Sequence, residues 1–194
     1  MRWYYGFLVL LMGCSTMKQS LPQDAQVSMG SAYIFGSFEL ESHKLLGFTC
    51  AGGVALALKG PTREDFLAFD EPRHWSHGVK SYSVVPGEYQ LNKWLGTHSR
   101  IGKDGGQHTG RKAVDYPFSL SFTAEPGTLY YIGDFDGRAQ CMCASGKHCA
   151  YISAPNDNFN ARLQELLEVY PALKDLRPVN LMPQFVYTGG GGDL

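Results

Sequence analysis

Three cysteines in the last third of the chain form a group that could bind a metal ion. Cys141, Cys143 and Cys149 have the spacing C-x-C-x₅-C, and His148 adds an imidazole. Thiolate and imidazole ligands suit zinc or copper(I). The spacing matches no standard zinc pattern, and the haem-attachment sequence C-x-x-C-H does not occur. A metal site at Cys141, Cys143, His148 and Cys149 is therefore the alternative interpretation of this segment.

The same three cysteines, together with Cys50, can instead form two disulfides. Four cysteines allow three connectivities. Cys141 and Cys143 lie two residues apart, so on a strand they would share one face, and a bond between them would strain the chain. We expect Cys143–Cys149 with Cys50–Cys141, and next in preference Cys141–Cys149 with Cys50–Cys143. Disulfides of this kind require an oxidising compartment.

Four histidines are a second set of candidate metal ligands. His74 and His77 lie three residues apart in EPRHWSHG, and His98 and His108 follow later in the chain. Three-residue spacing brings two side chains together only in a helix, whereas the flanking proline and glycine favour a loop. Solvent-exposed loop histidines are therefore the simpler interpretation.

Two short segments carry weaker chemical patterns. In GDFDG, Asp134 and Asp136 could bind calcium or act as an acid and a base, but the other ligands of a calcium loop are missing, so a polar turn is favoured. Gly102 to Lys112 is glycine-rich and basic, and could contact an anionic headgroup or a sugar. It does not match the phosphate-binding loop pattern, so a flexible hairpin connection is expected.

The N-terminal residues indicate where the protein is located. Arg2 precedes an apolar run from Trp3 to Met12, which is shorter than the about 20 residues of a membrane-spanning helix and suits a secretory signal. The run ends in Leu11-Met12-Gly13-Cys14, which resembles the lipobox of bacterial lipoproteins. The resemblance implies that residues 1–13 are removed and that Cys14 carries the lipid that anchors the protein to a membrane. An ordinary signal peptide is the alternative.

The residues after Cys14 bear on which membrane is involved. In the enterobacterial version of this family, an aspartate after the cysteine retains the protein at the inner membrane. Ser15 occupies that position here, which favours the outer membrane, with the protein facing the periplasm. Residues 14–29 are polar and lack sustained periodicity, so they predict a tether. An exported protein meets an oxidising compartment, which favours the disulfides over the metal site.

Composition limits the class of protein. A chain of 194 residues with 44% hydrophobic residues is long enough for one globular domain, which we place at residues 30–187, followed by a mobile tail at 188–194. The net charge of −1 and the lack of a long lysine or arginine run argue against nucleic acid as a partner. The many tyrosines, phenylalanines, glycines and prolines favour short strands joined by tight turns.

Strands dominate the predicted secondary structure. Alternating or aromatic-rich patterns predict strands at 31–40, 52–59, 82–95, 117–124, 128–135, 138–143, 149–154 and 179–187. Pro86-Gly87 predicts a turn between two strands within 82–95, and Pro126-Gly127 separates 117–124 from 128–135, which together predict a recurrent hairpin. One helix is expected from about 159 to 170, because apolar residues recur there at helical spacing. They are Phe159, Leu163, Leu166, Leu167 and Tyr170.

Part of this pattern resembles a known group of proteins. The pattern is similar to that of a broad group of bacterial lipoproteins with a small domain of unknown function, related in pattern to prealbumin-like and immunoglobulin-like β-sandwiches. The residues that carry the resemblance are Val85 to Tyr89, then Glu125 to Gly133, then the helix with Leu166 and Leu167. The resemblance spans about residues 80–170. It implies a mainly β fold, an antiparallel β-sandwich with one C-terminal amphipathic helix, and no catalytic residues.

These observations together lead to one expected function and one alternative. We expect a lipid-anchored cell-envelope protein without enzymatic activity or cofactor. Its aromatic face or a loop would contact an envelope protein or peptidoglycan. The alternative is an envelope hydrolase or metal-binding protein that uses the cysteine and histidine cluster.

Overall fold

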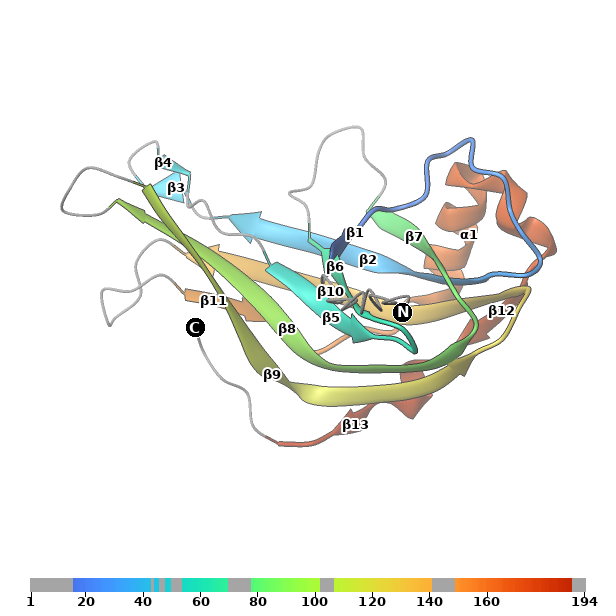
Figure 1. Ribbon diagram of the computed structural model, residues 1–194. Helices are drawn as coiled ribbons and strands as arrows, with labels where there is room; N and C mark the ends of the chain where they lie inside the picture. Colours follow the sequence, from blue (N-terminus) through green and yellow to red (C-terminus); the bar gives the residue numbers. More distant parts are fainter. Residues whose placement is uncertain are drawn as a thin grey trace, which may run out of the picture.

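Two β-sheets lie face to face, and a helix packs on the outer side of one of them (Figure 1). The structure is a computed structural model and describes residues 16–42, 44–45, 48–49, 54–69, 78–101, 107–140 and 149–189. The first sheet has the strand order β1 (Thr16–Lys18), β6 (Glu64–Ala68), β5 (Val54–Lys59), β8 (Gly87–Ile101), β9 (Gln107–Ala124) and β13 (Val186–Tyr187).

The second sheet has the order β11 (Cys149–Ile152), β10 (Thr128–Gln140), β2 (Ala32–Ser42) and β7 (Val79–Val84). A further strand, β12 (Arg177–Asn180), pairs with the beginning of β10, whereas β11 pairs with its end. A separate two-stranded ladder consists of β3 (Lys44–Leu45) and β4 (Phe48–Thr49). The chain is therefore mainly β, as predicted.

Both sheets are mixed, so the expectation of purely antiparallel sheets is wrong. β10 runs parallel to β2 and to β12, and β1 runs parallel to β6, while the other pairs are antiparallel. Parallel neighbours need a long crossover connection. Here β2 and β10 are separated in sequence by most of the first sheet, and a local sequence pattern does not record such a pairing.

The two Pro-Gly segments are corners between sheets, which corrects the predicted hairpins. Pro86-Gly87 joins β7 of the second sheet to β8 of the first, and Pro126-Gly127 joins β9 of the first to β10 of the second. Gly127 has a φ of 66° and Gly87 a φ of 145°, which other residues rarely adopt. The chain therefore turns out of one sheet and into the other at these two glycines.

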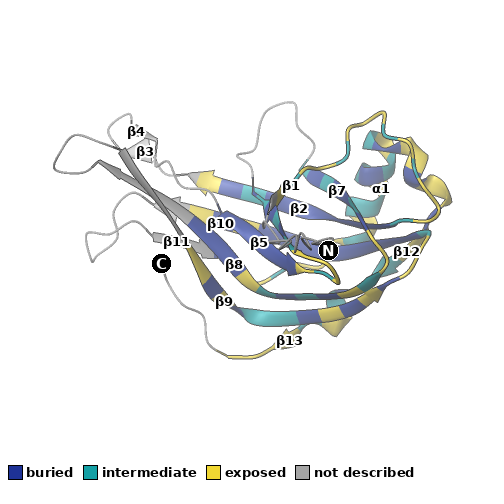
Figure 2. Ribbon diagram, viewed as in Figure 1, coloured by how far each residue is buried: buried dark blue, intermediate teal, exposed yellow. Residues whose placement is uncertain are grey.

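The space between the sheets is filled by an aromatic-rich core. Leu56, Leu91 and Leu120 of the first sheet contact a cluster that includes Phe38 and Phe135 of the second. The rings of Phe38 and Phe135 are stacked with centroids 5.7 Å apart. Figure 2 shows this buried layer in dark blue. Among the aromatic side chains that the structure describes, only that of Tyr187 is exposed, so the described aromatic residues mainly build the core.

The predicted helix is observed as α1 (Phe159–Val169), on the outer side of the second sheet. Its Leu166 is completely buried against a second cluster, which includes Phe35 and Tyr131. The carboxylate of Asp157 accepts a hydrogen bond from the Phe159 N–H (3.2 Å), one of the N–H groups at the start of the helix that have no partner within it. A 3₁₀ helix, η1 (Pro171–Asp175), follows directly.

The last predicted strand, 179–187, is divided. A 3₁₀ helix, η2 (Met182–Gln184), separates β12 from β13. Pro183 lies in the first turn of η2 and has no N–H for a strand ladder. The two pieces consequently join different sheets.

The first residues that the structure describes, from Thr16 onward, contact the two sheets. Residues 16–18 form β1 beside β6, and the side chains of Leu21 and Val27 pack against the helix-side cluster. The Leu21 N–H donates to the carbonyl of Ser81 (2.7 Å). The segment predicted as a tether therefore contacts the domain at several points, at residues 16–18, Leu21 and Val27. Among the described residues, no helix has the length and apolar character needed to cross a bilayer.

Candidate functional site

The pairing of β8 with β9 is interrupted halfway along the two strands. Leu91 pairs with Leu120, but the next pair is Lys93 with Asp115. Asn92 alone lies between these pairs on β8, whereas residues 116–119 lie between them on β9. This longer segment contains Pro117, which has no N–H for the ladder. The two strands therefore separate locally at Asn92.

Neighbouring segments hold the bulge in place. The backbone N–H and the hydroxyl of Thr188 both donate to the carbonyl of Pro117, at 2.8 and 3.1 Å. The hydroxyl of Tyr116 donates to the carbonyl of Ser153 in the layer below (2.6 Å). Tyr116 is almost fully buried. Hydrogen bonds from the β13 side and to the second sheet therefore hold the bulge in one conformation.

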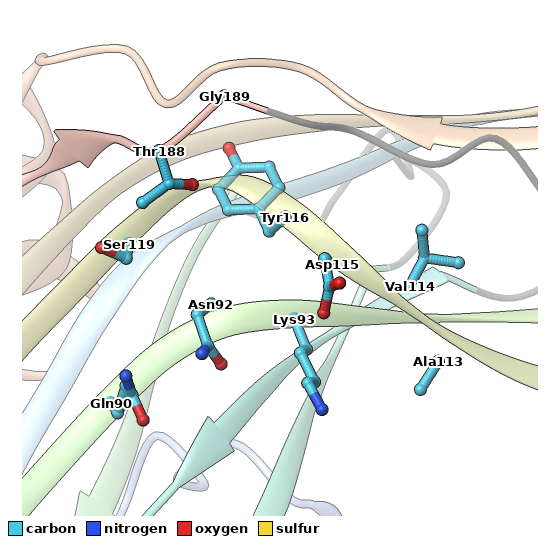
Figure 3. A pocket seen from close by; sticks show the side chains of 10 residues that line it. All are labelled: Gln90, Asn92, Lys93, Ala113, Val114, Asp115, Tyr116, Ser119, Thr188 and Gly189. Carbon is cyan, nitrogen blue, oxygen red and sulfur yellow. The ribbon is translucent and has the colours of Figure 1, made fainter.

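An open cavity of about 700 Å³ lies over the bulge on the outer face of the first sheet (Figure 3). Two further cavities of about 590 and 440 Å³ share Gln90 with it and extend toward the β5–β6 turn. We call the combined surface the polar trough. Its polar and charged lining residues, apart from the tyrosines, are Lys59, Thr62, Arg63, Glu64, Glu88, Gln90, Asn92, Lys93, Asp115, Ser119, Ser121, Thr123 and Thr188.

The polar trough offers unused hydrogen-bonding groups. Within the part of the chain that the structure describes, the side chains of Gln90, Asn92 and Ser119 have no hydrogen-bond partner, although each is half-buried. Lys93 and Asp115 face each other across the two strands and add one positive and one negative group. The surface can therefore bind a ligand rich in amides, hydroxyls and carboxylates.

Asp134 is in strand β10 and not in the polar turn that we predicted. Its carboxylate accepts hydrogen bonds from the hydroxyl of Tyr131 (2.9 Å), the amide of Asn158 (2.8 Å) and Nε of Arg162 (2.9 Å). A second guanidinium nitrogen of Arg162 contacts Glu165 at 2.6 Å. Asp134 is buried, and it joins the sheet to the beginning of α1. Its contacts are those of an anchor for the helix.

Burial and the charges in this cluster together shift two pKa values. Burial lowers the pKa of the Arg162 guanidinium, but the hydrogen bonds to Asp134 and Glu165 outweigh it and raise the pKa above its usual value. Burial, together with the negative charge of Asp134, raises the pKa of Tyr131, against a smaller lowering by the Asn158 N–H. Asp136, two residues along β10, is exposed, so the two carboxylates of GDFDG have different environments.

The cysteine group falls mostly beyond the described part of the chain. Cys14, Cys50, Cys141, Cys143 and His148 lie outside the described residues, and for Cys149 only the backbone, in β11, is described. The two disulfides and the alternative metal site therefore stay predictions. Among the side chains that are described, no group of three or more histidine, cysteine, aspartate or glutamate residues is placed to hold a metal ion.

The histidines are placed only in part. His74 and His77 lie outside the described residues. The backbones of His98 and His108 are in the β8–β9 hairpin, where His98 aligns with Gly110 and His108 with Arg100. Residues 107–112, which we expected to form a flexible connection, are part of β9.

Buried tyrosines predict a loss of stability at high pH. Burial is the largest cause that raises the pKa of Tyr89, Tyr116, Tyr131 and Tyr170 above the usual value of 10.0. The folded protein therefore holds these protons more tightly than the unfolded chain does. The stabilisation is complete below about pH 10 and is lost as the pH rises further. Urea unfolding at pH 8 and pH 11 should show a lower free energy of unfolding at pH 11, with a smaller loss in Tyr116→Phe. Equal losses in both proteins would contradict the assignment to Tyr116.

The polar trough was not found from the sequence. A proline inside a strand is a signal for a bulge, and Pro117 lies inside β9, between KAVDY and FSLSFTA. The position of Asn92 opposite the bulge depends on the register of β8 and β9, which the pattern does not reveal.

Compared with models of protein families, with curated proteins and with solved structures, the chain has no match, so its site is described by its own geometry.

Proposed function

We propose that the protein is a lipid-anchored, non-enzymatic binding module of a bacterial cell envelope, and that the polar trough holds its ligand on the periplasmic side of the outer membrane. The observation that supports this proposal best is the row of half-buried, unpaired amide and hydroxyl groups at Gln90, Asn92 and Ser119. Such groups, once shielded from water, gain stability from a ligand that hydrogen-bonds to them.

The ligand that we propose is peptidoglycan. Its sugar chain carries hydroxyl and N-acetyl amide groups, and its peptide carries amides, carboxylates and amines. The polar trough has a matching set of donors and acceptors, with Lys93 available for a carboxylate and Asp115 for an amine.

Binding to peptidoglycan is tested with one trough variant and one matched control. The full-length protein, solubilised in detergent, should sediment with purified peptidoglycan sacculi. Asn92→Ala should lower the affinity about tenfold, which corresponds to the loss of about 1.4 kcal/mol expected for hydrogen bonds from one amide. Asn160→Ala, which removes an exposed amide from α1 on the other sheet, should bind like the parent protein.

Two outcomes would contradict this assignment. If the protein does not sediment with sacculi, peptidoglycan is not the ligand. A photo-crosslinker placed at position 92 would then identify an envelope protein as the occupant. If Asn92→Ala and Asn160→Ala weaken binding equally, the ligand binds elsewhere than in the polar trough.

Lipid attachment at Cys14 is the second testable part of the proposal. Attachment occurs through a thioether, and a serine hydroxyl is too weak a nucleophile to replace the thiol. Cys14→Ser should therefore lose labelling by a fatty-acid probe and should no longer partition into the detergent phase. Ser15→Ala, which leaves the thiol intact, serves as the control and should keep the label. Equal labelling of parent and Cys14→Ser, or a mature N-terminus at another residue, would contradict the proposal.

A further inference from the structure

The distance between the proposed lipid and the folded domain is very short. Strand β1 begins at Thr16, where it aligns with Asp65 of β6. The Nζ of Lys18 and the carboxylate of Asp65 are 3.1 Å apart, which ties the two strands together. Cys14 precedes Thr16 by two residues, so their Cα atoms are at most about 7.6 Å apart. A lipid on Cys14, as proposed above, would therefore leave the domain directly at the start of β1.

The start of β1 belongs to one end of the two sheets, which we call the turn end. It consists of the three connecting segments 60–63, 85–86 and 125–127 (Figure 1). Arg63 contacts the carboxylate of Asp65 at 2.8 Å, beside Thr16. A Cβ placed on Gly87 would lie 2.9 Å from Cγ of Pro61, so the first two segments touch.

The third segment continues this surface. Gly87 pairs with Ala124 immediately before residues 125–127, and the methyl carbon of Met29 lies 3.0 Å from the position of a Cβ on Gly127. The start of β1, the three connecting segments and Met29 thus form one continuous surface.

Exposed apolar side chains gather at and beside this surface. Of the large hydrophobic residues that the structure describes as exposed, Met17 (46% exposed), Met29 (61%) and Val85 (54%) are here, and the other two are on β13. The prolines at 61, 86 and 126 are exposed as well. The charges here are mixed: Arg63 pairs with Asp65, Glu125 pairs with Arg177, and Lys59 and Glu88 are both exposed. Exposed apolar tips among charges that balance one another can enter the headgroup region of a phospholipid membrane.

We infer that the turn end is the membrane-facing surface of the protein. It rests on the phospholipid headgroups of the bilayer in which the lipid on Cys14 is inserted. The short link at residues 14–15 holds this end close to the bilayer, and Val85 and Met29 contact the interface. The strands then rise from the membrane. The part of the polar trough at Gly60 and Pro61 belongs to the turn end, whereas the cavity over the bulge, at Asn92 and Ser119, lies farther along β8 and β9 and stays accessible to its ligand.

The orientation is tested with a tryptophan introduced at Val85. The lipidated, full-length protein carrying Val85→Trp is incorporated into vesicles of phosphatidylethanolamine and phosphatidylglycerol, with and without brominated acyl chains. The backbone carbonyl of Val85 accepts a hydrogen bond from the Tyr89 hydroxyl (2.8 Å). Because the substitution changes only the side chain, it leaves this bond intact. The fluorescence of Trp at position 85 should shift to the blue and be quenched by the brominated lipid. The parent protein supplies the baseline.

A matched control comes from the far half of the domain. Ala154 is exposed and follows Ser153, whose N–H donates to the carbonyl of Asp136 (2.9 Å). Asp136 is about 26 Å along β10 from Thr128, the residue after the turn end. Ala154→Trp should therefore show no quenching. Amide hydrogen exchange should in addition be slower at Val85 and Gly87 in the vesicle-bound protein than in Cys14→Ser.

The outcomes separate this inference from the proposal on which it rests. If mass spectrometry finds no lipid on Cys14 and the protein does not float with the vesicles, the lipid anchor itself is wrong. If the protein is lipidated and floats, but Val85→Trp is not quenched or Ala154→Trp is quenched equally, the anchor is right and the orientation is wrong. Quenching at position 85 alone supports the turn end as the membrane-facing surface.

Discussion

Asp134→Ala is expected to lower the free energy of unfolding by about 3 kcal/mol. The substitution removes the acceptor that Tyr131, Asn158 and Arg162 share. The Tyr131 hydroxyl would be left with the carbonyl of Asn156 as its remaining acceptor (3.2 Å), and the guanidinium with Glu165. A partly buried cation that loses one of two carboxylates is costly, because burial has already removed much of its hydration.

The measurement is urea unfolding at neutral pH, and Asp136→Ala is the matched control. Asp136 is on the same strand, exposed, and its side chain makes no hydrogen bond within the described part of the chain. Its replacement should change stability by no more than about 0.5 kcal/mol. If both variants lose the same amount, the effect belongs to the strand and not to the cluster around Asp134.

Leu166→Asp is expected to have the largest effect on stability, about 4 kcal/mol or more. Leu166 is the residue of α1 that is completely buried, among Phe35, Tyr131 and Leu173. An aspartate there would place a carboxylate in this apolar cluster without a partner of opposite charge. Because the aspartate side chain is smaller than that of leucine, the substitution would also leave a cavity. The variant should unfold at a much lower urea concentration or fail to accumulate as a folded protein.

Two other substitutions on the same helix make this prediction specific. Leu167 is only half-buried, so Leu167→Asp should cost clearly less than Leu166→Asp. Asn160 is exposed in the first turn, where a negative charge is favourable, so Asn160→Asp should be neutral or slightly stabilising. Equal losses at 166 and 167 would mean that α1 is rotated relative to the arrangement described above.

The local pattern of the sequence determined the elements of this fold. The apolar spacing from Phe159 to Tyr170 predicted α1 almost to its ends, because a helix that covers a sheet must repeat its apolar residues every three to four positions. The strand at 31–40 was also predicted, and it is observed as β2. A Cβ on Gly36 would lie 2.3 Å from the carbonyl oxygen of Gly133, so the glycine permits the close approach of β2 and β10.

Only the tertiary structure decided how these elements are joined and what they display. The parallel pairing of β2 with β10, the two corners at Gly87 and Gly127, and the register that places Asn92 opposite the bulge at Pro117 all depend on contacts between segments far apart in the chain. Periodicity shows which side chains of a strand are buried, but it carries no information about which strand lies beside it. For this reason the sequence alone supplied the candidate lipid site at Cys14, whereas the polar trough and the role of Asp134 emerged from the folded chain.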